Sequence, residues 1–279
     1  MKIVTRDTPV SWQHSTLNTA IQVESLTVGH NRRVISEDLS LIVPEGGYTA
    51  IIGPNACGKS TLLRAISRIL PYEQGRVLIH GADIAHVPTR RLATRLGLLP
   101  QSSFSPEGIR VEDLVARGRH PHLGIFGRWS KADDDAVVEA MAATGISDLS
   151  GRQVDELSGG QRQRVWVAMV LAQATPILLL DEPTTFLDIA HQYGLLDLFE
   201  RLRRNMGRTI VAVLHDLNQA ARYATHLIVM KDGKVVTSGP PADVITAELI
   251  EHVYELPCRI APDPETGSPM VIPLSLIHI

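Results

Sequence analysis

The sequence predicts a mixed α/β fold in which a helical lobe is inserted into an α/β lobe. Three observations predict this arrangement. An apolar run at 48–52 ends in a glycine-rich loop that opens a helix, which gives the order strand, loop, helix. Two later apolar runs, at 176–183 and 209–215, are typical of buried strands, and the second is continuous enough to be covered on both faces. Between 102 and 174 the spacing of apolar residues is helical instead.

The composition is that of an ordinary globular protein. The chain has 279 residues, of which 44% are hydrophobic and 20% charged, enough for one or two lobes with a large core. A net charge of −3 disfavours nucleic acid as the main partner. No run approaches the ~18 apolar residues of a membrane span, and no signal peptide is recognisable, so we expect a soluble or peripheral intracellular protein. Two cysteines, Cys57 and Cys258, form no disulfide or metal-ligand framework, which agrees with a reducing compartment.

The N-terminal hundred residues alternate strand and helix patterns after a polar stretch at 1–19, which we expect to be a loose leader. The segment from Ala20 to Val43 alternates apolar and polar residues, which predicts two strands joined by a turn at 29–31. The other elements expected here are a helix at about 59–69, a strand at 76–79, a helix at about 89–96 and a strand ending at Gln101.

The inserted lobe and the C-terminal half are predicted in the same way. Ser130 and Asp133 occupy the two positions of a capping box, which predicts a helix start. The proline-rich tail beyond 240 is expected to be loop-rich apart from one helix at about 246–254. The other expected elements are helices at 111–119, at 130–144, from about 158, at about 190–205 and at 216–224, and two strands joined by a hairpin turn at 231–233.

The loop after the first apolar run is predicted to bind phosphate. Its glycines let the backbone approach phosphate oxygens, and the N–H groups at the helix start add a positive field. Lys59 is placed as the cation for the β- and γ-phosphates, and the Ser60 hydroxyl is placed as a ligand of Mg²⁺. We therefore expect a nucleoside triphosphate site. The loop residues are Gly53, Pro54, Asn55, Ala56, Cys57, Gly58, Lys59, Ser60 and Thr61.

Two acids stand where the buried strand at 176–183 ends. In a phosphate-loop enzyme, an acid at this strand end holds Mg²⁺ and an adjacent carboxylate can orient the attacking water. We assign Asp181 to the metal and Glu182 to the general base. The alternative is that both acids merely terminate a strand before Pro183.

A second anion-binding helix start is predicted at Leu157-Ser158-Gly159-Gly160-Gln161. Ser158 is placed as the N-cap, and the two glycines let the backbone approach an anion. This stretch lies in the helical lobe, away from the phosphate loop. The alternative is a flexible loop before an ordinary helix.

LSGGQ beside GPNACGKST and ILLLDEPTTFLD resembles the nucleotide-binding subunit of an ATP-binding cassette transporter, over about 20–274. The resemblance implies a P-loop NTPase core with an N-terminal antiparallel β lobe and an inserted helical lobe. It implies an ATPase domain at 20–258, with the helical subdomain at about 102–174 and a C-terminal tail at 259–279. It also implies ATP and Mg²⁺ as cofactors, and a homodimer whose two copies face head to tail around each ATP.

The resemblance also implies roles for individual residues. Ser158, Gly159 and Gly160, followed by Gln161, would reach the γ-phosphate bound to the other copy. Gln101 matches the glutamine that senses Mg²⁺ and the attacking water, and Asp188 matches the aspartate of the D-loop. His215 matches the switch histidine at the γ-phosphate, so Glu182, His215, Gln101 and Lys59 are the implied catalytic set.

The stretches at 113–122, 168–192 and 211–236 closely resemble bacterial ferric-siderophore importers, those of the enterobactin type in particular. Haem and cobalamin importers are the near alternatives. This implies a peripheral ATPase at the cytoplasmic face of the inner membrane, with permease subunits docking near 102–119 and a periplasmic or surface substrate-binding protein acting indirectly. A soluble cassette working on DNA or ribosomes is the rival, but the paired cassettes, coiled coil or basic extensions usual there are lacking. A binding-only cassette is disfavoured because Glu182 and His215 are both present.

Some positions depart from the family pattern or stand out within it. His30 occupies the place of the aromatic residue that stacks on adenine, and the alternative is a plain turn histidine. Ala56 replaces a common third glycine, at a cost of about 1 kcal/mol if its φ must be positive. We expect Cys57, beside the helix start and Lys59, to have a lowered pKa. Residues 275–279 match nothing in the family.

Overall fold

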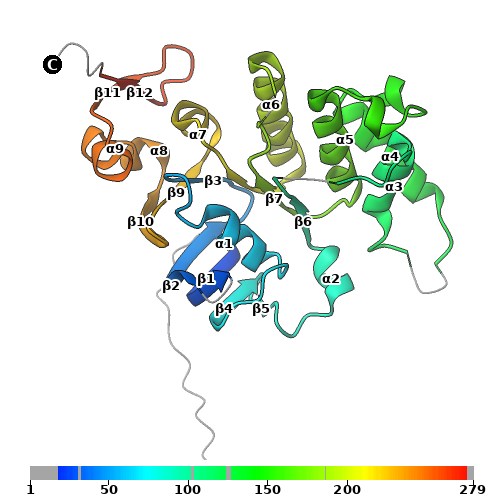
Figure 1. The fold of residues 1–279 in the computed structure, drawn as a ribbon, viewed down its shortest axis with the longest axis horizontal. Helices are drawn as coiled ribbons and strands as arrows, with labels where there is room; N and C mark the ends of the chain where they lie inside the picture. The colour runs from blue at the N-terminus through cyan, green and yellow to red at the C-terminus, as the bar shows by residue number, and fades with distance from the viewer. Residues whose placement is uncertain (1–17, 31–32, 102–103, 124–126, 186, 275–279) are drawn as a thin grey trace, which may run out of the picture.

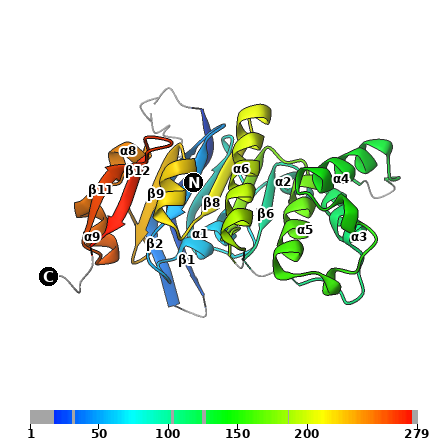
Figure 2. The same ribbon diagram turned by 90° about the horizontal axis from the view of Figure 1, so that it is seen from above.

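The computed structural model describes residues 18–30, 33–101, 104–123, 127–185 and 187–274. Most of the expected leader and the segment 275–279 lie outside these ranges. Figures 1 and 2 show a central sheet with the helical lobe at one end and the C-terminal elements at the other. The predicted mixed α/β fold with an inserted helical lobe is confirmed.

Within the described residues, the central sheet has six strands in the order β10-β9-β3-β8-β7-β6. β9, β3, β8, β7 and β6 run parallel, and β10 pairs antiparallel with β9. Every residue of β3, β7 and β8 is buried, as the continuous apolar runs predicted. The strands are β3 (Tyr48–Ile52), β6 (Leu96–Leu99), β7 (Ile177–Asp181), β8 (Thr209–Val213), β9 (His226–Lys231) and β10 (Lys234–Gly239).

The two faces of this sheet carry separate cores, because successive side chains of a strand point to opposite faces. In β7, Leu178 and Leu180 pack with α5 (Gly159–Ala172), α6 (Ile189–Met206) and α7 (Leu217–Tyr223). Ile177 and Leu179 instead pack with α1 (Lys59–Ile66) and the N-terminal strands. Helices α5, α6 and α7 therefore cover one face of the sheet, and α1 with the β lobe covers the other, as Figure 1 shows.

The N-terminal lobe is an antiparallel sheet in the order β2-β1-β4-β5. The predicted strand pair is confirmed, with His30 in the last position of β1 rather than in the turn. Two helices are shorter than expected. α1 ends at Ile66 and Arg68 adopts a φ of +60°, while α2 (Thr89–Ala93) ends before Leu96 starts β6. The strands are β1 (Thr19–His30), β2 (Arg33–Pro44), β4 (Gln74–Ile79) and β5 (Ala82–Asp83).

The helical lobe consists of α3 (Val111–Ala116), which continues as a 3-10 turn at Arg117–Arg119, α4 (Lys131–Ala143) and α5. Asp133 accepts hydrogen bonds from the N–H and the hydroxyl of Ser130, at 3.0 and 2.6 Å, so the predicted capping box is confirmed. The buried Arg119 bonds Asp133 at 2.9 Å and the carbonyl of Ala172 at 2.7 Å. One guanidinium therefore links the three helices.

The C-terminal segment is more ordered than its prolines suggested. After α8 (Pro241–Val244) and α9 (Ala247–Tyr254), β11 (Cys258–Pro262) and β12 (Pro269–Pro273) form an antiparallel hairpin. The side-chain amide of Asn218 in α7 accepts from the N–H of Val271 at 2.7 Å and donates to its carbonyl at 3.3 Å. The expectation of a loop-rich tail is therefore wrong for 258–273, because proline tolerates the ends and edges of strands.

The phosphate loop has a strained backbone at a residue that is not glycine. Gly53 and Gly58 have φ values of +152° and +103°, and Ala56 lies between them with a φ of +62°. A Cβ atom on Gly53 would stand 2.1 Å from the carbonyl oxygen of Met230. Ala56 therefore adopts the left-handed conformation that glycine would adopt without strain.

Replacing Ala56 with glycine tests that strain. Relief of a left-handed alanine is worth about 1 kcal/mol, and the added freedom of the unfolded chain offsets about 0.4–1 kcal/mol of it. We expect Ala56→Gly to leave the free energy of unfolding in urea unchanged or to raise it by less than about 1 kcal/mol. The control is Ala65→Gly inside α1, which we expect to lower it by about 1 kcal/mol or more. Equal losses in both variants would contradict the strain.

The buried ion pair in the helical lobe gives a pH dependence. Hydrogen bonds from Ser130, followed by those from Arg119, lower the pKa of Asp133 from 3.8 to about 2. The stability that this pair contributes is complete above about pH 4 and is lost as the pH falls toward 2. We expect Asp133→Asn to lower the free energy of unfolding at pH 7, and the difference from wild type to shrink between pH 4 and 2 in urea titrations.

The matched control for that measurement is Asp135→Asn, because Asp135 is an exposed acid on the same helix. Its removal is expected to leave both the stability and its pH dependence close to those of the wild type. A difference between Asp133→Asn and wild type that did not vary with pH would contradict the lowered pKa.

Candidate functional site

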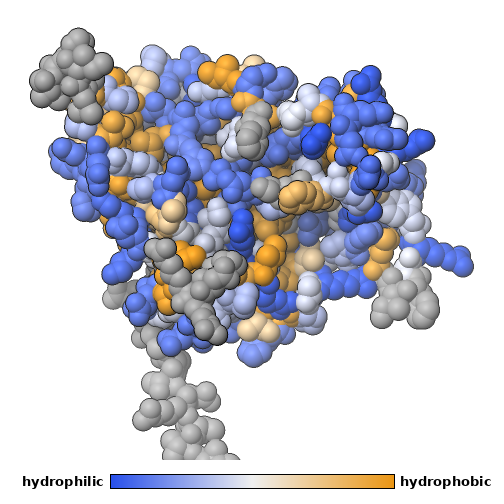
Figure 3. Space-filling model, in the orientation of Figure 1, coloured by the Kyte–Doolittle hydropathy of each residue, from blue (hydrophilic) through white to orange (hydrophobic). Residues whose placement is uncertain are grey.

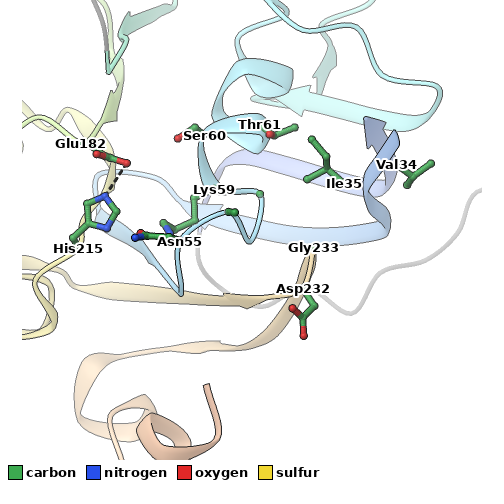
Figure 4. Close-up of a pocket in the computed structure, with 12 residues that line it drawn as sticks. Val34, Ile35, Asn55, Lys59, Ser60, Thr61, Glu182, His215, Asp232 and Gly233 are labelled. Carbon is green, nitrogen blue, oxygen red and sulfur yellow. Dashed lines mark ion pairs between the residues drawn. The ribbon is translucent and has the colours of Figure 1, made fainter. Parts of the chain in front are cut away.

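A cavity of about 840 Å³ lies where β3, β7 and β8 end (Figure 4). It brings together the phosphate loop, Glu182 and His215, three segments that are far apart in the sequence. Its lining residues are Val34, Ile35, Asn55, Ala56, Gly58, Lys59, Ser60, Thr61, Glu182, His215, Asp232 and Gly233.

Lys59 is held inside the phosphate loop. Lys59 is 5% exposed, and its ammonium group donates to the carbonyls of Gly53 at 2.8 Å and Pro54 at 2.7 Å. A buried ammonium group is costly unless it is paired, so these carbonyls hold the cation in place at the first residue of α1. The loop thus combines a fixed positive charge with the unpaired N–H groups of a helix start.

Ser60 and Asp181 form an oxygen-rich pair beside that cation. The Ser60 hydroxyl donates to Oδ1 of Asp181 at 2.7 Å. Asp181 is 1% exposed, and burial raises the pKa of its carboxyl. Its Oδ2 is buried and finds no hydrogen-bond partner among the described residues. A hydroxyl and an unsatisfied carboxylate oxygen are the donors that Mg²⁺ prefers, so these two residues fit that ion.

Glu182 and His215 form an ion pair across the cavity. Nε2 of His215 lies 2.7 Å from Oε1 of Glu182, as the dashed line in Figure 4 shows. Glu182 has a φ of +53°, which is strained for a side chain with a Cβ. The hydroxyl of Thr185 donates to its other oxygen at 3.3 Å. The carboxylate is therefore oriented by contacts on both of its oxygens.

The other predicted site residues lie outside the cavity. Gln101 is exposed, two residues beyond the end of β6. Ser158 and Gly159 are exposed at the start of α5. Asp188 is the N-cap of α6, and the N–H of His191, followed by its imidazole, lowers the pKa of the Asp188 carboxyl.

The start of α5 is built as predicted and is open to solvent. The hydroxyl of Ser158 accepts from the N–H of Gln161 at 3.3 Å, and the Gln161 side chain accepts from the N–H of Ser158 at 3.0 Å. No atom lies within 4 Å of a Cβ built on Gly159, whereas one on Gly160 would be 3.3 Å from the Leu187 side chain. The turn is therefore accessible to another molecule.

The sequence raised expectations for two further residues of this site, His30 and Cys57. The side chain of His30 lies outside the described part of the structure. The expected lowering of the Cys57 pKa is wrong, because burial raises the pKa of this thiol. Cys57 is 5% exposed, and the ammonium group of Lys59, 3.9 Å from the sulfur, only partly offsets that effect.

Sequence reasoning missed the wall formed by β2 and the β9–β10 hairpin. Gly233, with a φ of +74°, lies so close to β2 that a Cβ on it would stand 1.9 Å from the carbonyl oxygen of Ile35. Its N–H donates to the carbonyl of Cys57 at 3.1 Å. Lys231-Asp232-Gly233 carries a turn signal, but nothing in it signals a long-range contact with the phosphate loop.

Comparison with known proteins identifies the family. The family model described as ABC transporter matches residues 36–185. Within the described residues, no helix combines the length and the apolar character needed to cross a membrane. On the face of the molecule drawn in Figure 3, apolar residues are scattered among polar ones.

Curated relatives match over most of their length. The ferric enterobactin transport ATP-binding protein FepC of Escherichia coli (strain K12) is 54% identical, over 90% of this chain and 93% of that protein. The probable siderophore transport system ATP-binding protein YusV of Bacillus subtilis (strain 168) is 48% identical, over 91% and 92%.

Solved structures show the same fold. One is a chain of a metal-chelate type ABC transporter in an inward-facing conformation, with a TM-score of 0.79 and 28% identity over 94% of this chain and 100% of that chain. Another is a bacterial ABC transporter cassette in a dimeric structure, with a TM-score of 0.70 and 27% identity over 79% and 98%. The family match, the relatives and the cavity at the phosphate loop agree: the chain belongs to the ATP-binding cassette transporter family, as an ATP-binding subunit that hydrolyses ATP.

Proposed function

We propose that this chain energises the import of an iron–siderophore complex through a permease, as a peripheral subunit at the cytoplasmic face of the bacterial inner membrane. The cavity that joins the phosphate loop to Glu182 and His215 carries this proposal, because it supplies a site for hydrolysis and not only for binding. The relatives named for enterobactin and siderophore transport favour this cargo over haem or cobalamin.

In the proposed site, the backbone N–H groups of the loop, from Gly53 to Thr61, hold the phosphates of ATP. Lys59 places its charge beside the β- and γ-phosphates. Ser60 and Asp181 would hold Mg²⁺, with Gln101 contributing from the end of β6. When bound, this ion neutralises the charge that develops on the phosphates.

Glu182 is proposed as the general base. Its carboxylate orients a water molecule and accepts its proton while the γ-phosphoryl group is transferred. His215, whose Nε2 lies 2.7 Å away, holds that carboxylate on one side and lines the cavity that would receive the γ-phosphate. Removing the base leaves the phosphate loop, and with it the binding of ATP, intact.

We propose that two copies assemble head to tail. The exposed turn at 158–160 is preorganised for an anion, yet the phosphate loop of its own chain lies in a different lobe. A second copy would present its bound γ-phosphate to this turn and to Asp188. The dimeric structure of a similar cassette supports an assembly of two copies. The cassette domain of each copy would span about 20–258, with the helical subdomain at about 102–174.

A groove in the helical lobe is proposed to receive the permease. It has a volume of about 420 Å³ and an apolar floor that includes Val137 and Met141. Three acids, Glu112, Asp113 and Asp134, stand at its rim. Part of it belongs to the segment 102–119, where docking was expected. The occupant that fits this groove is a basic amphipathic helix of a permease loop.

Substitution of the proposed base separates hydrolysis from binding. We expect Glu182→Gln to lower the ATPase rate by about 100-fold or more, to retain ATP binding, and to accumulate a dimer in MgATP by light scattering. Glu251→Gln, an exposed acid in α9, is the control and should match the wild type. Near-normal turnover in Glu182→Gln would remove the assigned base.

Charge reversal at the groove tests the permease. We expect Asp134→Lys to reduce retention of the full chain on membranes that contain its permease, and to reduce ATP-driven uptake of ferric siderophore into vesicles. Glu139→Lys, on the same helix but outside the groove, is the control. Equal retention of both variants would refute this docking site.

The cargo is tested in the same vesicles. Uptake of haem or cobalamin, but not of a ferric siderophore, would overturn the cargo. Recovery of the protein with DNA or ribosomes, and not with a permease, would favour the soluble rival.

A further inference from the structure

Gln219 is a buried polar residue for which the proposed mechanism has no use. It lies in the first turn of α7 and is 4% exposed, next to the buried Ala220 and Ala221. An apolar side chain would suit that environment, and a buried amide is costly unless it is hydrogen-bonded. What Gln219 bonds is therefore informative.

Its amide reaches across to the neighbouring helix and, through it, to the loop that follows Glu182. Nε2 of Gln219 donates to Oε1 of Gln192 in the first turn of α6, at 2.9 Å. Nε2 of Gln192 in turn donates to the carbonyl of Leu187, at 3.0 Å. Leu187 immediately precedes Asp188, the N-cap of α6.

The hydrogen bonds from Gln219 to Gln192 and from Gln192 to Leu187 form a relay. At its other end, Gln219 is bonded to the residue that follows His215. The N–H of Gln219 donates at 2.9 Å to the carboxylate of Asp216, the N-cap of α7 and the residue after His215. The residue before Gln219, Asn218, pairs with Val271 in β12. The first turn of α7 is thus held on one side by α6 and on the other by the C-terminal hairpin.

Both ends of the relay therefore bear on Glu182. His215 contacts its carboxylate directly, and Leu187 lies five residues further along the same loop. Glu182 adopts a left-handed φ of +53°, a conformation that persists only where several contacts hold it. The amide pair adds contacts to both segments, to α7 behind His215 and to Leu187 in the loop after Glu182.

We propose that Gln219 and Gln192 are positioning residues for ATP hydrolysis: their paired side chains hold α7, and with it His215, in fixed relation to the loop that carries Glu182. The inference rests on Glu182 being the general base. Neither glutamine touches the nucleotide cavity, so both act on turnover through the geometry of the Glu182–His215 pair.

Two variants break the relay at different links. Gln219→Leu removes the bond between the helices and leaves Gln192 bonded to Leu187. Gln192→Glu keeps an acceptor for Gln219, but an ionised carboxylate cannot donate to the Leu187 carbonyl. Gln173→Leu is the control, because Gln173 also donates its amide to backbone carbonyls, those of Ala93 and Leu96. Leu96 pairs with Ile177, at the end of β7 opposite to Glu182.

The measurement is the steady-state ATPase activity of the full chain, with the melting temperature of each variant. We expect kcat to fall by about 10- to 100-fold in both relay variants, because misplacement by about 1 Å has effects of this size. The KM for ATP should stay within about two-fold of wild type, since the phosphate loop is untouched. Gln173→Leu should lower the melting temperature without lowering kcat.

A double variant shows whether the two residues act as one unit. Gln192→Leu combined with Gln219→Leu should lower kcat no further than the more severe single change. Losses that multiply would overturn the shared relay. So would relay variants whose kcat stays within about two-fold of wild type while their melting temperatures fall as in Gln173→Leu. A wild-type chain without ATPase activity would instead overturn the proposed function, and should Gln219→Leu fail to fold, Gln192→Glu still decides the question.

Discussion

The nucleotide site depends on the register of three buried parallel strands. Ile51 of β3 and Asp181 of β7 both pair with Val213 of β8, so the three strands end at the same level of the sheet. The residues that follow them, in the phosphate loop and at Glu182 and His215, are thereby delivered to one cavity (Figure 4). A slip by one residue would turn Asp181 to the opposite face of the sheet and away from Ser60.

The cavity and its surroundings combine buried charge with strained backbone. Lys59 and Asp181 are each almost fully buried; Lys59 donates hydrogen bonds to carbonyls of the loop, and Asp181 accepts one from Ser60. Ala56 and Glu182 have positive φ values close to the phosphate-binding backbone. Strained residues of this kind gather at functional sites, where the surrounding structure holds them in place.

The helical lobe adds the parts that a single nucleotide cavity lacks. It carries the turn at 158–160, proposed to meet a second copy, and the acid-rimmed groove, proposed to receive the permease. Arg119 links its three helices. α5 also reaches back to the core, because Gln163 donates to the carbonyl of Pro183 at 3.1 Å. The helical lobe therefore directly contacts the loop beside Glu182.

Features that depend on neighbours along the chain could be predicted before the structure was known. Apolar runs predicted the buried strands, glycine spacing predicted the phosphate loop, and Ser130 and Ser158 predicted two capped helix starts, because each of these is a local property of the backbone. The burial of individual residues and the contacts between distant segments could be learned only from the three-dimensional packing. Burial reversed the expected shift in the Cys57 pKa, pairing made a hairpin of the proline-rich tail, and helix packing joined Gln192 to Gln219. Desolvation and long-range contacts leave no periodic pattern in the sequence, because they arise between segments that are not neighbours along the chain. They could therefore not be predicted from local sequence patterns.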